Sequence, residues 1–361
     1  MNDANELISF IASMSGEGNL RVEENLGEGY VRLRVSEAER RQAKHDIQHV
    51  EDIVIEMLRN ARDAGADKVY LATTKEDGVR TLVFLDKRSG VPQDMQERIF
   101  DARVTSKLES MKMDRWGVHG RGMALFSIKQ NTDEACVVAS DVDLGSVFKV
   151  SVATDRLGER ADQSSWPQAV KDEDGHYVCA RGPHNIIRAA CEFALEELRA
   201  CDVYLGSPSE IAATLHAQAS SRLDASRLLF IDDEAELPVV DRLGLASDAE
   251  DFIRICSGLG LEMSERTAHR ILAGQIKPVR GVTARLLRER DSSSHASAPV
   301  DLAKDRRGLR IAKDDMAQFS RAVERDFNDL ASRYYLNLCG DPKIRVSRDR
   351  ITVTFDLAKE E

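Results

Sequence analysis

Apolar residues follow a helical period in some segments of the chain and alternate with polar residues in others. The helical period is clearest over residues 52–64, where Ile53, Met57, Leu58, Ala61 and Ala64 share one broad face. Further helices are predicted at 36–44, 123–129, 186–201, 248–261, 265–273 and 314–338. Strands are predicted at 30–35, 69–73, 80–85, 134–139 and 147–152, and a hairpin at 344–356.

This order of elements predicts an α+β fold in which helices cover one face of a mixed, mainly antiparallel sheet. Residues 158–182 are polar and contain Pro167 and an Asp-Gly turn, which indicates a linker or an insertion. We therefore expect an N-terminal domain at 1–157 and a second, mostly helical α+β region at 183–361. The serine-rich stretch near 291–300 divides that second region.

The composition narrows the class of protein. A chain of 361 residues with 42% hydrophobic and 31% charged residues is typical of a soluble protein of two or three domains. No apolar run approaches the roughly 20 residues that span a bilayer, so no membrane segment is expected. Six cysteines without a C-x-x-C pair argue against a zinc site or a disulfide framework and suit a reducing cytoplasm.

The clearest candidate chemistry is a pair of polar residues on the helix at 52–64. Glu56 and Asn60 are four residues apart, so their side chains project from the same side of that helix. A carboxylate in this position can activate a water molecule, and an amide oxygen can ligate a hard cation such as Mg²⁺. A polar pair at this spacing is also common on solvated helix surfaces, so the pair by itself leaves both interpretations open.

Two later motifs favour a nucleotide. Asp86 ends a predicted strand and could accept a hydrogen bond from the amino group of adenine, while Gly90 lets the backbone approach the base. The motif Gly117-x-x-Gly120-x-Gly122 opens a predicted helix, where backbone amides can hold phosphates. It follows a polar loop and lacks Gly-Lys-Ser/Thr, which excludes the Rossmann and Walker A motifs.

In this order and at this spacing the three motifs resemble the GHKL ATPases, the superfamily of DNA gyrase B, the ninety-kilodalton heat-shock chaperone, histidine kinases and MutL. The resemblance covers residues 40–155. The run Glu56–Ala66 and Thr105-Ser106-Lys107 are most similar to MutL, and the glycine motif is as similar to the chaperone. Gly145-Ser146 stands where these proteins carry Gly-Thr, and Arg88 stands where they carry glycine.

The resemblance implies a Bergerat-type α/β sandwich that holds ATP and Mg²⁺ between the Glu56 helix and a mobile lid. In that arrangement Glu56 is the general base, and Asn60 ligates Mg²⁺. Asp86 reads adenine with the help of Gly90 and Ser146. The phosphates are held by Gly117, Gly120, Gly122 and Lys107.

The predicted function is ATP binding with Mg²⁺-dependent hydrolysis to ADP. Closure of the lid over ATP would change the contacts that the domain makes with the second region, a protein partner or a second copy of the chain. Two alternatives stay open: a non-catalytic nucleotide sensor or adaptor that binds DNA through 265–290, and a MutL-like DNA-repair ATPase. A histidine kinase is disfavoured, because no helical segment with a phospho-acceptor His precedes the ATP domain.

Residues 265–290 form a basic segment. Seven Lys or Arg residues stand there against Glu265 and Glu289, in a chain whose net charge is −11. The overall charge disfavours unspecific nucleic-acid binding, though not binding by a local patch. Residues 263–274 resemble the reader helix of a helix-turn-helix, and a basic, solvated helix pair explains the same pattern.

Overall fold

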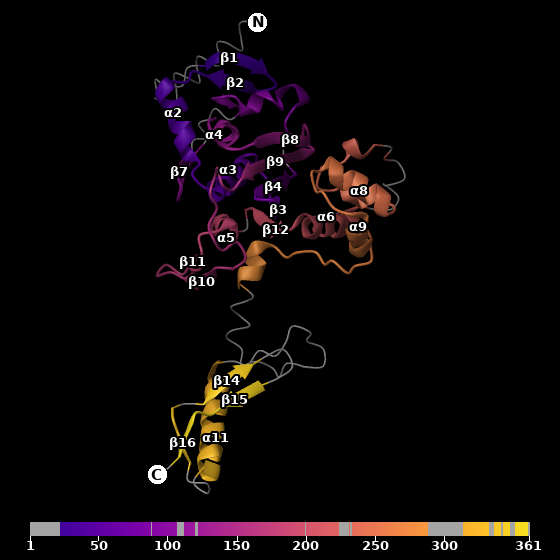
Figure 1. Cartoon of the computed structure of the whole chain (residues 1–361). Helices are drawn as coiled ribbons and strands as arrows, with labels where there is room; N and C mark the ends of the chain where they lie inside the picture. Colours follow the sequence, from indigo (N-terminus) through magenta and orange to yellow (C-terminus); the bar gives the residue numbers. More distant parts are fainter. Residues whose placement is uncertain are drawn as a thin grey trace. The chain divides into compact units, whose positions relative to one another are not determined.

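The computed structural model describes residues 22–87, 89–106, 112–119, 122–198, 200–223, 231, 233–287, 313–331, 336–340, 342–346 and 351–359. The chain forms two compact units, Met1–Asp291 and Ser292–Glu361 (Figure 1). The domain boundaries expected near 157 and 182 stay predictions. None of the described helices is long and apolar enough to cross a membrane.

A five-stranded sheet forms the centre of the first unit. Its strands are β3 (Lys68–Glu76), β4 (Val79–Asp86), β8 (Glu134–Asp141), β9 (Gly145–Ala153) and β12 (Asp202–Gly206), in the order β12-β3-β4-β9-β8. Only β12 and β3 are parallel; the other three neighbouring pairs are antiparallel. The prediction of an α+β fold with a mixed, mainly antiparallel sheet is therefore confirmed, although β12 was not predicted.

Four helices lie on one side of this sheet: α2 (Glu37–Asp46), α3 (Val50–Asp63), α4 (Ala124–Asn131) and α5 (Ile186–Glu196). Alternate strand residues such as Leu71 and Phe84 point to this side, where they share a buried core with Leu58 of α3 and Phe193 of α5. Helix α2 begins at the predicted capping box, in which Ser36 and Glu39 bond each other's backbone.

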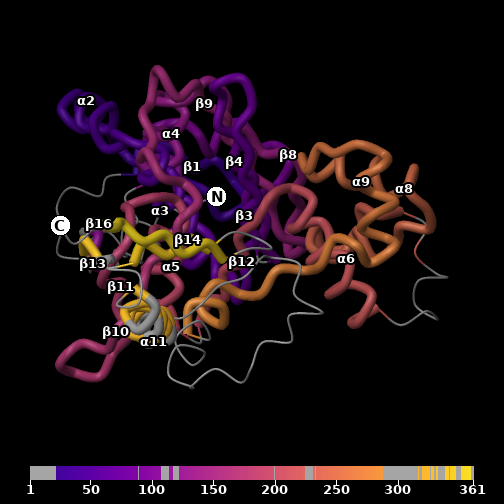
Figure 2. The backbone as a smooth tube through the Cα atoms, turned by 60° about the horizontal axis from the view of Figure 1, so that its bottom comes forward, coloured from indigo at the N-terminus to yellow at the C-terminus, as the bar shows by residue number. Residues whose placement is uncertain are grey.

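Helices also cover the opposite face. They are α6 (Pro208–Arg222), α8 (Ala249–Gly258) and α9 (Glu265–Leu272), with the 3-10 turns η3 (Glu234–Glu236) and η4 (Arg242–Leu245). Tyr70, Val83 and Leu85 point to this face and pack against Leu215 of α6 and Phe252 of α8. Figure 2 shows α3 and α5 on one side of the strands and α6, α8 and α9 on the other.

The helices on this second face come from residues 183–361, outside the domain at 1–157 for which helices on one face were predicted. Both faces of the sheet are covered because 69–72 and 82–85 are uninterrupted apolar runs, as is typical of strands buried on both faces. Helix α6 was not predicted, since its buried residues at 211–215 are consecutive and give no helical period.

Smaller elements complete the first unit. They are β1 (Val22–Gly27), β2 (Tyr30–Leu33) and β5 (Val104–Thr105) in one sheet, the hairpins β6 (Lys112–Asp114) with β7 (Gly117–His119) and β10 (Gln168–Lys171) with β11 (Tyr177–Arg181), and the turns η1 (Gln93–Met95) and η2 (Arg98–Phe100). The hairpin β10–β11 occupies the segment interpreted from sequence as a linker or insertion.

The second unit contains α11 (Lys313–Ala331) and two strand pairs, β13 (Leu336–Leu338) with β16 (Leu357–Lys359) and β14 (Lys343–Val346) with β15 (Ile351–Thr354). The predicted hairpin is confirmed, and the predicted helix at 314–338 is too long. Its last residues, Leu336–Leu338, form a strand because they pair with Leu357–Lys359. Phe327 of α11 stacks on Phe355 with ring centroids 4.0 Å apart.

Candidate functional site

The first unit has a cavity of about 500 Å³ between α3, the ends of β4 and β9, and the start of α4. Six of the nine predicted site residues line it: Glu56, Asn60, Asp86, Gly90, Gly122 and Ser146. These residues are up to 90 positions apart in sequence (146 − 56 = 90). The fold therefore brings together the helix pair, the strand-end carboxylate and the last glycine of the motif around one space.

Helix α3 forms one wall of the cavity. Its apolar residues pack on the sheet, and Glu56 and Asn60, one turn apart, fall where the helix borders the cavity. The helix ends at Asp63, and Gly65 follows with a φ of +79°, as expected for a glycine that closes a helix.

A buried polar pair lies where the cavity meets the sheet. Asp86 and Ser146 face each other across β4 and β9, and the Ser146 hydroxyl donates a hydrogen bond of 2.7 Å to Asp86 Oδ2. Both residues are 5% exposed. A carboxylate this far from bulk solvent is costly unless it is hydrogen-bonded, so the hydroxyl both stabilises it and fixes its orientation.

Gly90 is required by the packing of the loop after β4. Its φ is +59°, and a Cβ atom there would lie 1.7 Å from the Asp141 carbonyl oxygen. The loop is fixed further by Val91 N–H, which donates to Ser140 Oγ at 2.7 Å, and by Ser89 Oγ, which donates to the Ala64 carbonyl at 3.0 Å. The close backbone approach expected at Gly90 is thus an approach to β8.

The first turn of α4 forms another part of the wall. Gly122, Met123, Ala124 and Leu125 line the cavity, and no side chain among the described residues caps the start of this helix. Amides in the first turn have no partner within the helix, which gives that end a partial positive charge. Ser127 lines the cavity as well. Its hydroxyl is buried and has no hydrogen-bond partner among the residues that the structure describes.

The segment from Arg103 to Gly122, which contains β5 and the hairpin β6–β7, begins and ends at residues that contact each other. Arg103 N–H donates to the Gly122 carbonyl at 2.8 Å, and both residues have positive φ, +63° and +68°. The Arg103 side chain bonds Glu39 of α2. Burial acts to raise the pKa of Glu39, but hydrogen bonds from Ser36 and Arg103 outweigh it and lower that pKa.

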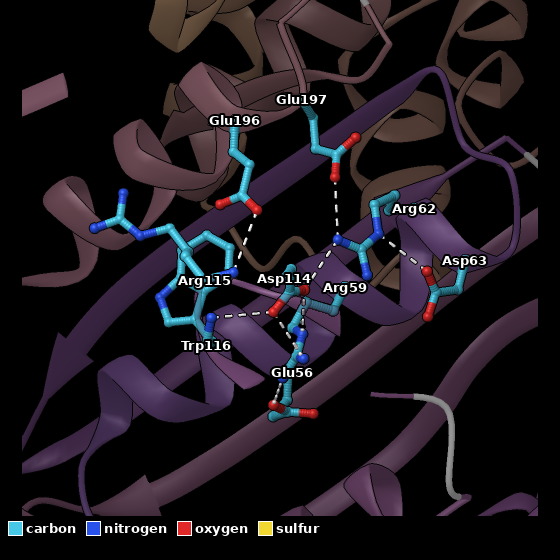
Figure 3. Close-up of polar contacts among 9 residues, drawn as sticks. All are labelled: Glu56, Arg59, Arg62, Asp63, Asp114, Arg115, Trp116, Glu196 and Glu197. Atoms are coloured by element: carbon cyan, nitrogen blue, oxygen red, sulfur yellow. Dashed lines mark hydrogen bonds and ion pairs between the residues drawn. The ribbon is translucent and has the colours of Figure 1, made fainter. Parts of the chain in front are cut away.

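Within that segment, the hairpin β6–β7 is tied to α3 by buried ion pairs (Figure 3). Asp114 receives two hydrogen bonds from Arg59, at 2.9 and 3.0 Å, and one of 3.1 Å from Arg62. Arg59 also donates to Glu56 Oε1 at 2.6 Å. The side chains of Arg59, Arg62 and Asp114 are at most 8% exposed, so water screens these pairs little.

The same cluster reaches α5 and the segment that follows it. Arg62 donates to Glu197 at 3.0 Å and to Asp63 at 3.0 Å. Burial acts to lower the pKa of Arg62, but Asp63, Glu197 and Asp114 outweigh it and raise that pKa. Trp116 of the hairpin stacks near Phe193 of α5, with ring centroids 6.3 Å apart. The hairpin therefore contacts both α3 and a helix from the second half of the chain.

The cavity is acidic. Of the described residues that line it, five are Asp or Glu and one is Arg: Glu39, Asp46, Glu56, Asp63, Asp86 and Arg59. Nowhere in the described ranges do three His, Cys, Asp or Glu side chains form a group able to hold a metal ion. Asn60 and Glu56 both lie on α3 at the cavity, and Mg²⁺ commonly takes only one or two ligands from a protein and the others from water and substrate phosphates.

Three predicted site residues, Lys107, Gly117 and Gly120, are not among the described residues that line the cavity. Lys107 and Gly120 lie outside the described residues, and so does Arg88, which stands where the resembled proteins carry glycine. Gly117 lies in β7 and is not among the described lining residues. Sequence reasoning missed Arg59, Asp114 and Ser127. The only signal for Arg59 was its position on α3 three residues after Glu56, and Asp114 is 55 residues further along the chain.

No protein-family model matches this chain, and no curated protein matches it either.

Proposed function

We propose that the cavity binds ATP with Mg²⁺ and that the protein hydrolyses ATP to ADP and phosphate, as a GHKL ATPase with a Bergerat-type nucleotide domain. The observation that carries this proposal is the meeting of four features around one cavity of about 500 Å³: Glu56, Asn60, the Asp86–Ser146 pair and the start of α4. Each feature suits a different part of a nucleoside triphosphate.

Asp86 is the adenine reader in this proposal. Its buried carboxylate, oriented by the Ser146 hydroxyl at 2.7 Å, accepts a hydrogen bond from the exocyclic amino group of adenine. Guanine carries a carbonyl oxygen at that position, and two oxygen acceptors facing each other in a buried site are unfavourable. The pocket therefore prefers adenine to guanine nucleotides.

The start of α4 is the phosphate end. Uncapped amides at Met123–Leu125 donate hydrogen bonds to phosphate oxygens, and the buried Ser127 hydroxyl is a further donor there. Because five carboxylates line the cavity, a free triphosphate would be repelled. Bound Mg²⁺ supplies the positive charge that offsets this repulsion, and Asn60 holds it through the side-chain oxygen.

Glu56 is the general base. Its carboxylate accepts a proton from the water that attacks the γ-phosphorus, as the bond from the γ-phosphorus to the bridging oxygen breaks and ADP leaves. Arg59, 2.6 Å from Glu56 Oε1, fixes the direction of this carboxylate. Arg59 is a positioning residue, since it acts on the water through Glu56.

The Arg59 contact also favours a second candidate, a nucleotide sensor that hydrolyses slowly. A carboxylate held by a buried guanidinium is a weaker proton acceptor than one facing only water. The two candidates share the ATP site and differ in turnover, so a single set of measurements separates them.

Closure of the segment between Arg103 and Gly122 over bound ATP is the proposed switch. The hairpin of this segment is bonded to α3 through Asp114 and packs on α5 through Trp116. Any movement of the hairpin must therefore change contacts with the second half of the chain, and this connects nucleotide state to a protein partner or a second copy. Protease cleavage within 101–122 that is the same with and without a non-hydrolysable ATP analogue would contradict closure.

The decisive experiment compares ATP binding by calorimetry with phosphate release for wild type, Glu56→Gln and Asn60→Ala. Glu56→Gln should bind ATP as wild type does and hydrolyse it roughly 10²–10⁴-fold more slowly, the usual contribution of a general base. Asn60→Ala should lose the part of the affinity that depends on Mg²⁺.

Glu236→Gln is the matched control, because Glu236 is an exposed glutamate outside the cavity. It should leave binding and turnover unchanged. Wild-type turnover in Glu56→Gln rules out the assignment of the base. Absence of ATP binding by the wild type rules out both candidates, whereas tight binding with no turnover favours the sensor.

A further inference from the structure

Helices α8 and α9 form a compact pair joined by a tight turn on the face of the sheet opposite the cavity. Phe252, Ile255 and Cys256 of α8 and Ala268 and Ile271 of α9 are buried in one core. Gly260 in the connecting turn has a φ of +67°, which allows the chain to reverse within a few residues. The position of α9 relative to α8 is therefore fixed by packing.

Helix α9 buries only a narrow stripe of its surface. Ala268 and Ile271 face the core, whereas Glu265, Arg266, His269, Arg270 and Leu272 are exposed. Figure 1 shows α8 and α9 beside α6 at the edge of the first unit. A helix that is held by one stripe presents most of its circumference to a partner.

The exposed part of α9 is basic. Arg266 and Arg270 are one turn apart on the same side, and neither forms an ion pair with another described residue. Lys277 and Arg280 follow in the next loop and are exposed as well. These four Lys and Arg residues stand against the exposed Glu262 and Glu265, although the chain as a whole carries −11. Arg285 is not part of this surface, because it stacks on Trp166 at 3.8 Å.

We propose that α8 and α9 form a helix-turn-helix that binds duplex DNA, with α9 in the major groove. An α-helix with its side chains is about 10–12 Å across, and the major groove is about 12 Å wide, so a helix exposed around most of its circumference fits it. Arg266 and Arg270 reach guanine edges in the groove, and Lys277 and Arg280 contact phosphates.

Charge and shape together favour DNA over other partners. A duplex is strongly negative, and the acidic remainder of this chain would repel it everywhere except at a basic surface. The deep, narrow major groove of duplex RNA does not admit a helix. Residues 249–287 do not line the cavity, so α9 is available whether or not the cavity holds a ligand.

The test measures fluorescence anisotropy of the full chain, without nucleotide, with a labelled 30-base-pair duplex selected from a pool with a random centre. The double variant Arg266→Glu/Arg270→Glu should bind this duplex at least tenfold more weakly than wild type and with a smaller salt dependence, since two contacts to bases and phosphates are lost. The control Arg181→Glu reverses one exposed charge on β11 and should bind as wild type does.

Thermal unfolding of the double variant should match that of wild type, because both arginines are exposed. If the double variant is less stable, two further measurements decide whether α9 binds DNA. The first is duplex binding by the variant Arg266→Gln/Arg270→Gln, and the second is the protection of guanine N7 from methylation by the wild-type protein. Guanine N7 protected in the selected site supports the proposal. No duplex binding by wild type at 50 mM salt, equal binding of duplex RNA, unprotected guanines, or wild-type binding by the double variant overturns it.

Discussion

The two ends of the cavity are built in different ways. The sheet end, formed by Asp86, Gly90 and Ser146, is held by strand pairing, short hydrogen bonds and a backbone contact that leaves no room for a Cβ atom. The hairpin end, formed by β6–β7 and the contact between Arg103 and Gly122, is held by side-chain ion pairs, by the stacking of Trp116 on Phe193 and by a backbone hydrogen bond from Arg103 to Gly122.

This difference suggests separate roles: the sheet end recognises the nucleotide, and the hairpin end changes its contacts when the nucleotide binds. Strand pairing and close packing are lost only when the sheet itself opens, so the sheet end has one geometry. The guanidinium groups that hold the hairpin end have further partners, Glu56 for Arg59 and Glu197 for Arg62, so this end is the part that can rearrange when a nucleotide binds. The following variants test that contrast, from the largest expected effect to the smallest.

Gly90→Ala should destabilise the first unit by about 4 kcal/mol. A residue other than glycine at this φ costs about 1–2 kcal/mol, and displacing the Asp141 carbonyl from the new Cβ adds a similar or larger amount. Urea unfolding measures the loss. Gly78→Ala is the control, since Gly78 has a φ of +80° but no neighbour within 4 Å, and only the conformational cost should appear. Equal losses in both variants would show that the sheet end is not tightly packed.

Asp114→Asn should cost about 3 kcal/mol, because it leaves two buried guanidinium groups with fewer partners. Amide hydrogen exchange should rise in β6 and β7 and stay unchanged in β4 and β9. Asp101→Asn removes an exposed partner of Arg32 in the same part of the chain and should cost less than about 1 kcal/mol. Faster amide hydrogen exchange in β9 of the Asp114 variant would show that the two ends of the cavity are not independent.

Ser146→Ala should weaken ATP binding about tenfold, since a hydrogen bond to a charged group contributes about 1.5–3 kcal/mol and here orients the Asp86 carboxylate. Ser146→Thr keeps the hydroxyl and should bind within about twofold of wild type. Calorimetry gives both affinities. If alanine and threonine bind equally well, the hydroxyl has no part in orienting Asp86.

The smallest effect concerns pH. The folded-state pKa of Glu39 is lowered, so its bonds to Ser36 and Arg103 add stability above about pH 4.5, the value expected for the unfolded chain. That contribution is lost as the pH falls through the lower, folded-state pKa. Wild type should therefore lose more stability than Glu39→Gln between pH 6 and pH 3.5. Parallel thermal unfolding curves at both pH values for the two proteins would exclude this role of Glu39.

The sequence patterns predicted the elements that depend on residues close together in the chain. Helix α3 follows from its apolar period and ends before Gly65, and the cap of α2 follows from Ser36 and Glu39. β12 could not be predicted in the same way, because a five-residue strand becomes part of the sheet only through its pairing with β3, more than 100 residues earlier.

The same holds at the cavity. Asp86 stands out in the sequence because it ends an apolar strand, but its partner Ser146 was indicated only by the family resemblance. Nothing in the sequence connects Arg59 to Asp114, because an ion pair across 55 residues depends on where the fold places the hairpin. The roles of these residues toward ATP stay predictions until the variants are measured.

The backbone contact between Arg103 and Gly122 has a consequence for how this protein can change over evolutionary time. Because Arg103 and Gly122 already meet at a backbone hydrogen bond of 2.8 Å, a change in the length of the chain between β5 and β6 leaves the start of α4 beside Arg103. Doubling a flexible loop costs only about 0.6 kcal/mol in closure entropy. Insertions and deletions should therefore be tolerated between β5 and β6, but not in the hairpin itself, where Asp114 and Trp116 contact α3 and α5.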